Sequence, residues 1–198
     1  DDLLSNNFIL ENKLNNILKE QILYIENKIN ISLSTIYLMI DDPKIFSINI
    51  STKSNNEKNQ IQKKQIEYLI QDLKQQISFS NKDLKILHII AENFILDGRQ
   101  TETVPINNYC KDLVIEVQFI CIKKNLIKFI QDIFKKYQID FELIISTKYA
   151  LSQAPINRKS LLEAGLGIIN CTNHNEVFIL PKKTTKLGFF ERIFHIFS

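Results

Sequence analysis

The 198-residue sequence contains no tryptophan, a single methionine, and only four glycines and four prolines. Glycine and proline punctuate loops, so their scarcity argues against long structureless connections. No apolar run approaches the roughly 18 residues that a membrane-spanning helix needs. The acidic start, Asp1-Asp2, is unlike the basic start of a signal peptide. The chain begins without methionine, which leaves open whether residues precede Asp1.

Residue clusters that would hold a metal ion or a disulfide framework are missing as well. The cysteines are odd in number and show no Cys-x-x-Cys spacing, which favours reduced thiols in a cytosolic protein. The histidines are scattered, without the spacing of a metal site. These residues are Cys110, Cys121, Cys171, His88, His174 and His195. The formal net charge of +3 is too small to indicate nucleic-acid binding.

Hydrophobic residues make up 44% of the chain, which is ordinary for a globular protein and enough for a sizeable core. Apolar residues at helical spacing predict helices from about Phe8 to Lys28, from Ile61 to Ile77 and from Lys124 to Tyr137. Tyr24, Tyr37 and Tyr68 are expected in the core. The fold class predicted is α/β, in the sense of an α+β domain with a mixed sheet.

Apolar and β-branched runs predict the strands. They are Thr35–Ile40, Phe46–Ile50, Leu84–Ile90 with Phe94–Leu96 extending or pairing with it, Leu113–Ile122, Phe141–Ile145, Leu166–Ile169 and Val177–Leu180. The turn-forming run Asp41-Asp-Pro-Lys44 predicts that the first two strands form a hairpin, and Asp97-Gly98 predicts a second turn. Alternation in Leu113–Ile122 places Leu113, Ile115, Val117, Phe119 and Cys121 on one face.

The stretch Leu84-Lys-Ile-Leu-His-Ile-Ile-Ala-Glu-Asn-Phe-Ile-Leu-Asp97 resembles a segment of the bacterial cell-division protein FtsA that runs "vLHviPqeyaiD". Leu87, His88 and Asp97 fall at matching places. Further similarities occur in the same order along roughly Leu10 to Leu180. They include Ile31–Ile50, Val104-Pro105, Leu113–Val117, Ala150 and Gly165 before an apolar run. Collinearity over this length, more than one motif, indicates the family.

The resemblance implies the FtsA-specific subdomain, a strand-helix-strand-strand unit of an actin-like fold that contacts neighbouring subunits and late division proteins. The pilus-assembly protein PilM has a related architecture and is the nearest rival family. His88 itself is expected to be a hydrogen-bonded residue in or beside a strand rather than a binding residue.

The sequence departs from the family where nucleotide is held. Actin-like ATPases cradle phosphates with two glycine-rich hairpins, because backbone N–H groups must approach the phosphates closely. The first would precede Asp1, and the second, Asp-Ile-Gly-Gly-Gly-Thr, is replaced by Asn170, Cys171, Thr172, Asn173, His174 and Asn175. The rest of the ATPase body, which grips FtsZ, has no counterpart after Leu180. We therefore expect no nucleotide, cofactor or metal, and FtsZ binding is not assumed.

No set of residues suggests catalysis. Ser146 and Ser152 lack a Gly-x-Ser-x-Gly context, and the carboxylates form no obvious acid/base pair. We therefore expect a protein that is not an enzyme.

The last residues resemble the FtsA tail, a linker followed by an amphipathic helix. Pro181-Lys-Lys-Thr-Thr-Lys186 is basic, and the next residues place an aromatic stripe opposite a polar face, as in an interfacial membrane helix. The predicted membrane-binding residues are Leu187, Phe189, Phe190, Ile193, Phe194, Ile196 and Phe197, with Lys182, Lys183, Lys186 and Arg192 meeting anionic lipid. Packing of this helix on the domain is the alternative.

The predicted organisation is an interaction subdomain (1–163), a remnant of an actin-like strand pair (164–180), a linker (181–186) and a membrane-targeting helix (187–198). The predicted function is a divisome scaffold at the septum that binds division proteins or itself and attaches peripherally to the inner face of the cytoplasmic membrane. A PilM-like binding module of a pilus or secretion assembly and a decayed, non-functional remnant are the alternatives.

Overall fold

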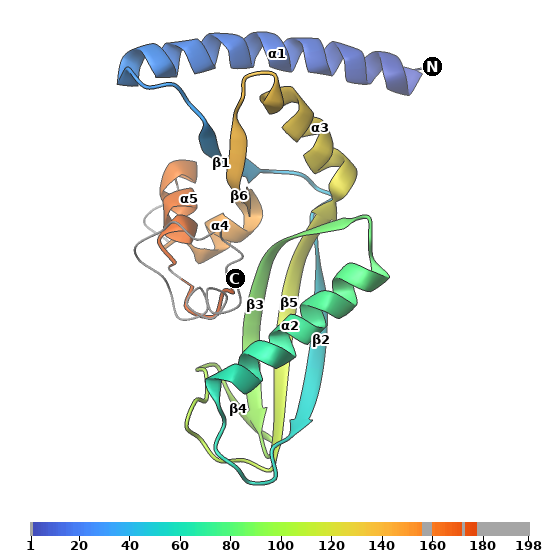
Figure 1. Cartoon of the computed structure of the whole chain (residues 1–198), viewed down its shortest axis with the longest axis vertical. Coiled ribbons are helices and arrows are strands. Elements are labelled where there is room, and N and C mark those ends of the chain that lie inside the picture. Colours follow the sequence, from blue (N-terminus) through green and yellow to red (C-terminus); the bar gives the residue numbers. More distant parts are fainter. Residues whose placement is uncertain (1, 156–159, 172, 178–198) are drawn as a thin grey trace. The chain divides into compact units, whose positions relative to one another are not determined.

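The computed structural model describes residues 2–155, 160–171 and 173–177. The chain divides into two compact units. Unit 1 comprises Asp1–Leu38 and Asn125–Leu143, and unit 2 comprises Met39–Lys124 and Ile144–Ser198. The predicted α/β fold class is confirmed (Figure 1), although the four-stranded sheet, predicted to be mixed, is antiparallel. The predicted domain boundaries stay predictions, and those after residues 180 and 186 lie outside the described residues.

Unit 2 is built on a four-stranded antiparallel sheet. Its strands are, in spatial order, β2 (Phe46–Asn55), β5 (Asp112–Lys123), β3 (Leu84–Leu96) and β4 (Arg99–Thr101). Helix α2 (Lys63–Ser80) lies across one face of β3, β5 and β2 (Figure 1). The order strand, helix, strand, strand therefore holds for β2, α2, β3 and β5, with the short β4 as the return of a hairpin.

The core of unit 2 follows from two matching periodicities. Every second residue of β5 from Leu113 to Cys121 points to the α2 side, and all five are at most 1% exposed. Helix α2 meets them with a stripe at positions 66, 70, 73 and 77, again nearly unexposed. Burying one such Leu or Ile contributes roughly 1.5–3 kcal/mol, so this two-layer core is the main stabilising element of the unit.

Two short helices and a terminal strand-like segment complete unit 2. They are α4 (Thr147–Gln153), α5 (Leu161–Ile169) and residues 175–177, which add to the edge of β3. The Ala91 N–H donates to Asn175 O at 2.9 Å, and the Val177 N–H donates to Ile89 O at 2.7 Å. Helix α5 begins at the N-cap residue Ser160, whose Oγ accepts the Glu163 N–H and whose hydroxyl donates to the Glu163 carboxylate.

Unit 1 holds the long helix α1 (Asp2–Ile29) and helix α3 (Lys124–Lys135) with a small core of its own. Strands β1 (Thr35–Ile40) and β6 (Asp140–Ser146) pair in a two-stranded sheet. Ile22, Phe134 and Ile139 are the buried centre, and the Phe134 ring meets Phe141 edge-on at 5.1 Å. No helix among the described residues is long and apolar enough to cross a bilayer.

The predicted hairpin of Thr35–Ile40 with Phe46–Ile50 is wrong. The turn itself exists, since the Lys44 N–H donates to Asp42 Oδ1 and the Ile45 N–H to Asp42 O. The flanking strands, however, belong to different sheets: β1 pairs with β6, and β2 pairs along its whole length with β5. A turn motif in the sequence indicates that the chain bends there. It does not determine with which other strand each flanking strand pairs, since that depends on which pairing buries the apolar residues.

The predicted strand Leu166–Ile169 is also wrong, because these residues form the last turn of helix α5. Of the predicted strand Val177–Leu180, only Val177 is described, next to the bridge between Ile90 and Glu176. Leu84–Ile90 and Phe94–Leu96 are one strand, β3, which continues through two irregularities in its register. The Asp97-Gly98 turn is confirmed, with positive φ at both residues.

The three tyrosines expected in the core lie largely at the surface. Tyr24 is 62% exposed, Tyr68 71% and Tyr37 39%. The hydroxyl group lets a tyrosine cover the rim of a helix or strand while its oxygen stays in water, so an apolar stripe overestimates its burial. Phe94 and Phe119, by contrast, are fully buried.

Candidate functional site

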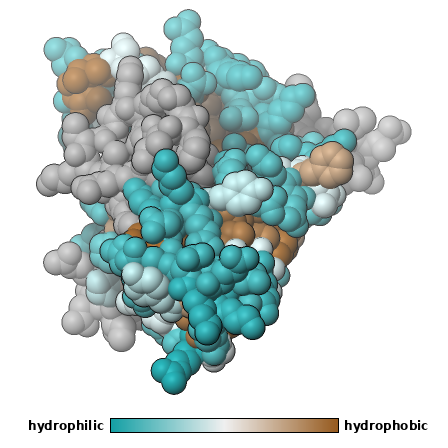
Figure 2. Space-filling model, turned by 60° about the horizontal axis from the view of Figure 1, so that its bottom comes forward, coloured by the Kyte–Doolittle hydropathy of each residue, from teal (hydrophilic) through white to brown (hydrophobic). Residues whose placement is uncertain are grey.

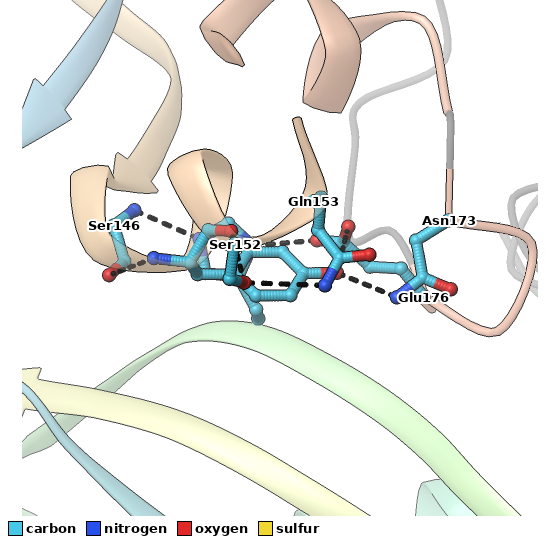
Figure 3. Close-up of polar contacts among 7 residues, drawn as sticks. Ser146, Ser152, Gln153, Asn173 and Glu176 are labelled. Carbon is cyan, nitrogen blue, oxygen red and sulfur yellow. Dashed lines mark hydrogen bonds and ion pairs between the residues drawn. The ribbon is translucent and has the colours of Figure 1, made fainter. Parts of the chain in front are cut away.

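A buried polar cluster joins three segments of unit 2. Figure 3 shows it between the strands of the sheet and the short helices. His88 comes from β3, Ser146 and Tyr149 from the start of α4, and Asn173 and Glu176 from the terminal segment. Glu176 accepts two hydrogen bonds, from His88 Nδ1 at 2.6 Å and from the Tyr149 hydroxyl at 2.8 Å. The described side chains of His88 and Glu176 are at most 2% exposed.

The partners of His88 define its tautomer. The Ser146 backbone N–H donates to His88 Nε2 at 2.9 Å, so Nε2 carries the lone pair. The proton of the neutral ring therefore sits on Nδ1, where it is donated to the Glu176 carboxylate. A second proton on Nε2 would point at the Ser146 N–H. The expectation that His88 is a hydrogen-bonded residue of a strand is confirmed.

Tyr149 closes the cluster. Its ring lies 4.5 Å from the His88 ring, and its hydroxyl accepts a hydrogen bond from Asn173 Nδ2 at 3.0 Å. Burial, and then the neighbouring Glu176 charge, raise the pKa of Tyr149 far above its ordinary value of 10.0. The raised pKa favours the protonated hydroxyl, which donates to Glu176 Oε2.

The residue types Ser, His and Glu invite comparison with a hydrolytic triad, but the geometry differs. In a triad the serine Oγ donates to the histidine, and the reacting atoms face a substrate. Here the His88 nitrogen meets the backbone N–H of Ser146, while Ser146 Oγ caps α4 by accepting the Tyr149 N–H. The cluster is arranged to fasten three segments together, and its His88 and Glu176 side chains are at most 2% exposed.

Two open regions of unit 2 offer surface to a partner. Strand β2 is a long edge strand, with Phe46 41% exposed at its start. Next to it, a pocket of about 250 Å³ is lined by Phe46, Lys148 and Ser152, among others. An unpaired strand edge presents N–H and C=O groups that another chain can extend. Lys53 on β2 forms an ion pair with Asp112 of β5 at 3.3 Å.

The β4 end of unit 2 carries a wider hollow of about 700 Å³. Its lining is polar and includes Arg99, Gln100, Asn107 and Tyr109. Hydrophilic residues dominate the face of the molecule seen in Figure 2. Asp97 in this lining accepts the Lys111 and Asp112 N–H groups, which lower its pKa. These bonds hold the hairpin turn against the start of β5.

The described residues in place of the phosphate loop donate several of their backbone N–H groups within the chain. Asn170 ends α5, and its N–H donates to Leu166 O. The N–H groups of Cys171, Asn175 and Glu176 are likewise donated within the chain, the last two to Asn173. His174 is exposed, and Thr172 lies outside the described residues. Backbone groups engaged in this way do not form the open nest that a phosphate requires.

The predicted membrane-binding residues, from Lys182 to Phe197, all lie outside the described residues, so these assignments stay predictions. The three cysteines are buried thiols. Burial raises the pKa of the Cys121 thiol to about 11, which keeps it protonated and unreactive near neutral pH.

Comparison with known families supports the strand-helix-strand-strand reading. Residues 43–121 match the family model described as "SHS2 domain inserted in FTSA". This range contains β2, α2, β3, β4 and nearly all of β5, so the match falls on the strand-helix-strand-strand part of unit 2. The predicted resemblance to FtsA is confirmed on this domain. No curated protein matches the chain.

Sequence reasoning missed Tyr149 and Glu176 as partners of His88. They are 61 and 88 positions away along the chain, counted from residue 88 to residues 149 and 176. No local periodicity links such distant positions. One available signal was the isolated glutamate before the apolar run at Val177, since a carboxylate entering a core requires buried donors.

Proposed function

We propose that this protein is a non-catalytic cell-division adaptor that binds division proteins or further copies of itself. We also propose that it is held peripherally at the inner face of the cytoplasmic membrane by residues 181–198. The observation that carries the proposal is the match of residues 43–121 to the SHS2 domain inserted in FtsA. This domain supports a protein-interaction role related to cell division, whereas the membrane attachment rests on the sequence pattern of the tail.

The described residues support a binding role over catalysis. The buried cluster uses each donor and acceptor of His88 and Glu176 to join segments, and it leaves none of these atoms facing a cavity. The N–H groups of Asn170, Cys171, Asn175 and Glu176 are donated within the chain, which argues against a phosphate-binding loop at these positions. The open edge of β2 gives a partner strand a place to add, a common mode of protein recognition.

Liposome co-sedimentation tests the membrane part. The full chain and a chain ending at Leu180 are each mixed with anionic and with neutral vesicles, at low and at physiological salt. We expect the full chain to pellet with anionic vesicles, more so at low salt, because lysines near the surface meet anionic headgroups. We expect the shortened chain to stay in solution. Equal pelleting of both chains, or of neither, contradicts membrane attachment through the tail and favours the PilM-like alternative or the remnant.

Two tail variants separate the apolar and the electrostatic contributions. Phe190→Ser with Phe194→Ser removes the stripe and keeps the charge, whereas Lys182→Gln with Lys183→Gln keeps the stripe. We expect the first pair to abolish binding at both salt concentrations and the second to weaken it mainly at low salt. A fluorescent fusion of the full chain should gather at the division site of dividing bacteria, and an even distribution would contradict the cell-division role.

The β2 edge is tested by Phe46→Ser, with Tyr68→Ser on α2 as the matched loss of one exposed aromatic ring. Size-exclusion chromatography with light scattering measures self-association, and crosslinking in cell extracts measures partner capture. We expect Phe46→Ser to reduce association and Tyr68→Ser to leave it unchanged. Equal association in both variants rules out the β2 edge as the contact surface.

A further inference from the structure

Helix α5 is apolar on both of its faces. Its inward face, Ala164, Gly165 and Ile168, is buried. Gly165 lies so close to Met39 that a Cβ there would be 2.7 Å from the methionine sulfur. On the opposite face Leu162 is 72% exposed and Leu166, one turn later, is 45% exposed. A helix that is apolar all round is normally covered on all sides.

A further exposed leucine comes from the neighbouring helix. Leu151 of α4, the helix that packs against α5, is 39% exposed. The one charged residue of α5, Glu163, is held at its first turn by hydrogen bonds with Ser160. We call Leu151, Leu162 and Leu166 the leucine patch.

The chain itself carries a segment whose pattern fits the leucine patch. Phe190, Ile193, Phe194 and Phe197 recur at the spacing i, i+3, i+4, i+7, which aligns them along one face of a helix. Helix α5 has nine residues and the stripe spans eight positions, 190–197, so both are about 12–14 Å long at 1.5 Å per residue. The nine residues 178–186 between Val177 and Leu187 reach roughly 30 Å when extended, more than twice the length of α5.

We propose that the apolar stripe of residues 187–198 docks on the leucine patch of its own chain in the absence of lipid, and that a membrane competes with the patch for this stripe. The inference rests on the proposed membrane role of the tail and adds its regulation. Docking covers two apolar surfaces that otherwise face water. A membrane-bound tail, in turn, exposes the leucine patch to a partner only at the membrane.

Only a molecule whose tail is undocked can bind lipid. The apparent affinity for lipid is therefore the intrinsic affinity multiplied by the fraction of molecules whose tail is undocked. If nine tails in ten are docked, freeing them increases the apparent affinity about tenfold. The test variant is Leu162→Gln with Leu166→Gln, since glutamine keeps helix propensity and both sites are exposed. The matched control is Tyr68→Gln with Phe79→Gln, which removes two exposed aromatic rings from α2. Circular dichroism checks that both variants are folded.

Two measurements test the proposal. Hydrogen exchange of residues 187–198 without lipid should show protection in the full chain and in the control, and none in the leucine variant. In a titration with anionic vesicles, the leucine variant should reach half-binding at about tenfold less lipid. Equal exchange in all three proteins overturns the docking. Protection that increases with protein concentration also overturns it, because the tail would then dock on a second copy.

The outcomes separate this inference from the proposed function. If the tail is protected by the leucine patch but the full chain does not bind vesicles, the membrane role fails and the docking stands. If the full chain binds vesicles through its tail but the tail exchanges freely without lipid, the membrane role stands and the docking fails.

Discussion

Removing the Tyr149 hydroxyl tests whether the buried cluster stabilises unit 2. Tyr149→Phe leaves the ring, and with it the 4.5 Å contact with His88, in place. It deprives Glu176 of one donor at 2.8 Å and deprives Asn173 of an acceptor at 3.0 Å. Glu176 is 4% exposed, so water does not replace the lost donor. Hydrogen bonds to a charged group contribute about 1.5–3 kcal/mol, and we expect a loss of about 2 kcal/mol in the free energy of unfolding.

Urea unfolding followed by circular dichroism measures the loss. The midpoint should fall while the dependence on urea concentration stays the same. Tyr109→Phe, at a residue that is 70% exposed, is the control and should change stability by less than about 0.5 kcal/mol. In a protein that already carries Glu176→Gln, Tyr149→Phe should lower the free energy of unfolding by less than it does in the wild type. We expect the difference, which is the coupling energy of the two residues, to be about 1 kcal/mol. A Tyr149→Phe protein as stable as the wild type, or additive effects in this cycle, would refute the reasoning.

Three further predictions concern other positions in unit 2. Burial raises the pKa of Glu67 above its ordinary value of 4.5, against the lowering effect of Lys63 and Lys64. The wild type should therefore lose stability relative to Glu67→Gln as pH rises from below 4.5 through the raised pKa, and a pH-independent difference would contradict this. Gly98→Ala should cost about 1 kcal/mol in thermal unfolding, because φ there is +84° while a Cβ would meet no atom within 4 Å. Phe119→Ala should cost about 3–5 kcal/mol in urea unfolding, since Phe119 is fully buried, and a loss below about 1 kcal/mol would contradict its place in the core.

The sheet and its covering helix were predictable because their signals are local. Alternation identified every inward residue of β5, and helical spacing identified α2. Which strands pair was harder to predict from the sequence. Strand β2 pairs with β5 although more than fifty residues separate them along the chain, from Asn55 to Asp112. A turn at Asp42 could not reveal that β1 and β2 lie in different sheets, because a turn fixes direction and leaves the partner open.

Helix α5 shows how composition can mislead. Its run from Leu161 to Ile169 is as apolar as a buried strand, and short apolar runs do not distinguish the two. The pair Ser160 and Glu163 gave the missing signal, because a serine followed three residues later by a glutamate starts a helix. The cluster around His88 was beyond such reasoning, since its members come from three segments that only tertiary packing joins.

The segment that adds to the edge of β3 also bears on how the protein is made. His88 and its partner Glu176 are 88 residues apart, and within the part of the chain that the structure describes the edge of β3 near Ile89 pairs with residues 175–177. The sheet lacks β5 until Lys123 has been added, and residue 175 follows 52 positions later. At 5–20 residues per second, a ribosome needs roughly 3–10 s to add these residues. During that interval the sheet of unit 2 is present but lacks its pairing with residues 175–177. In this interval a second nascent chain that emerges nearby can pair with the open edge of β3. The risk of such intermolecular pairing is greatest when several ribosomes translate the same mRNA close together.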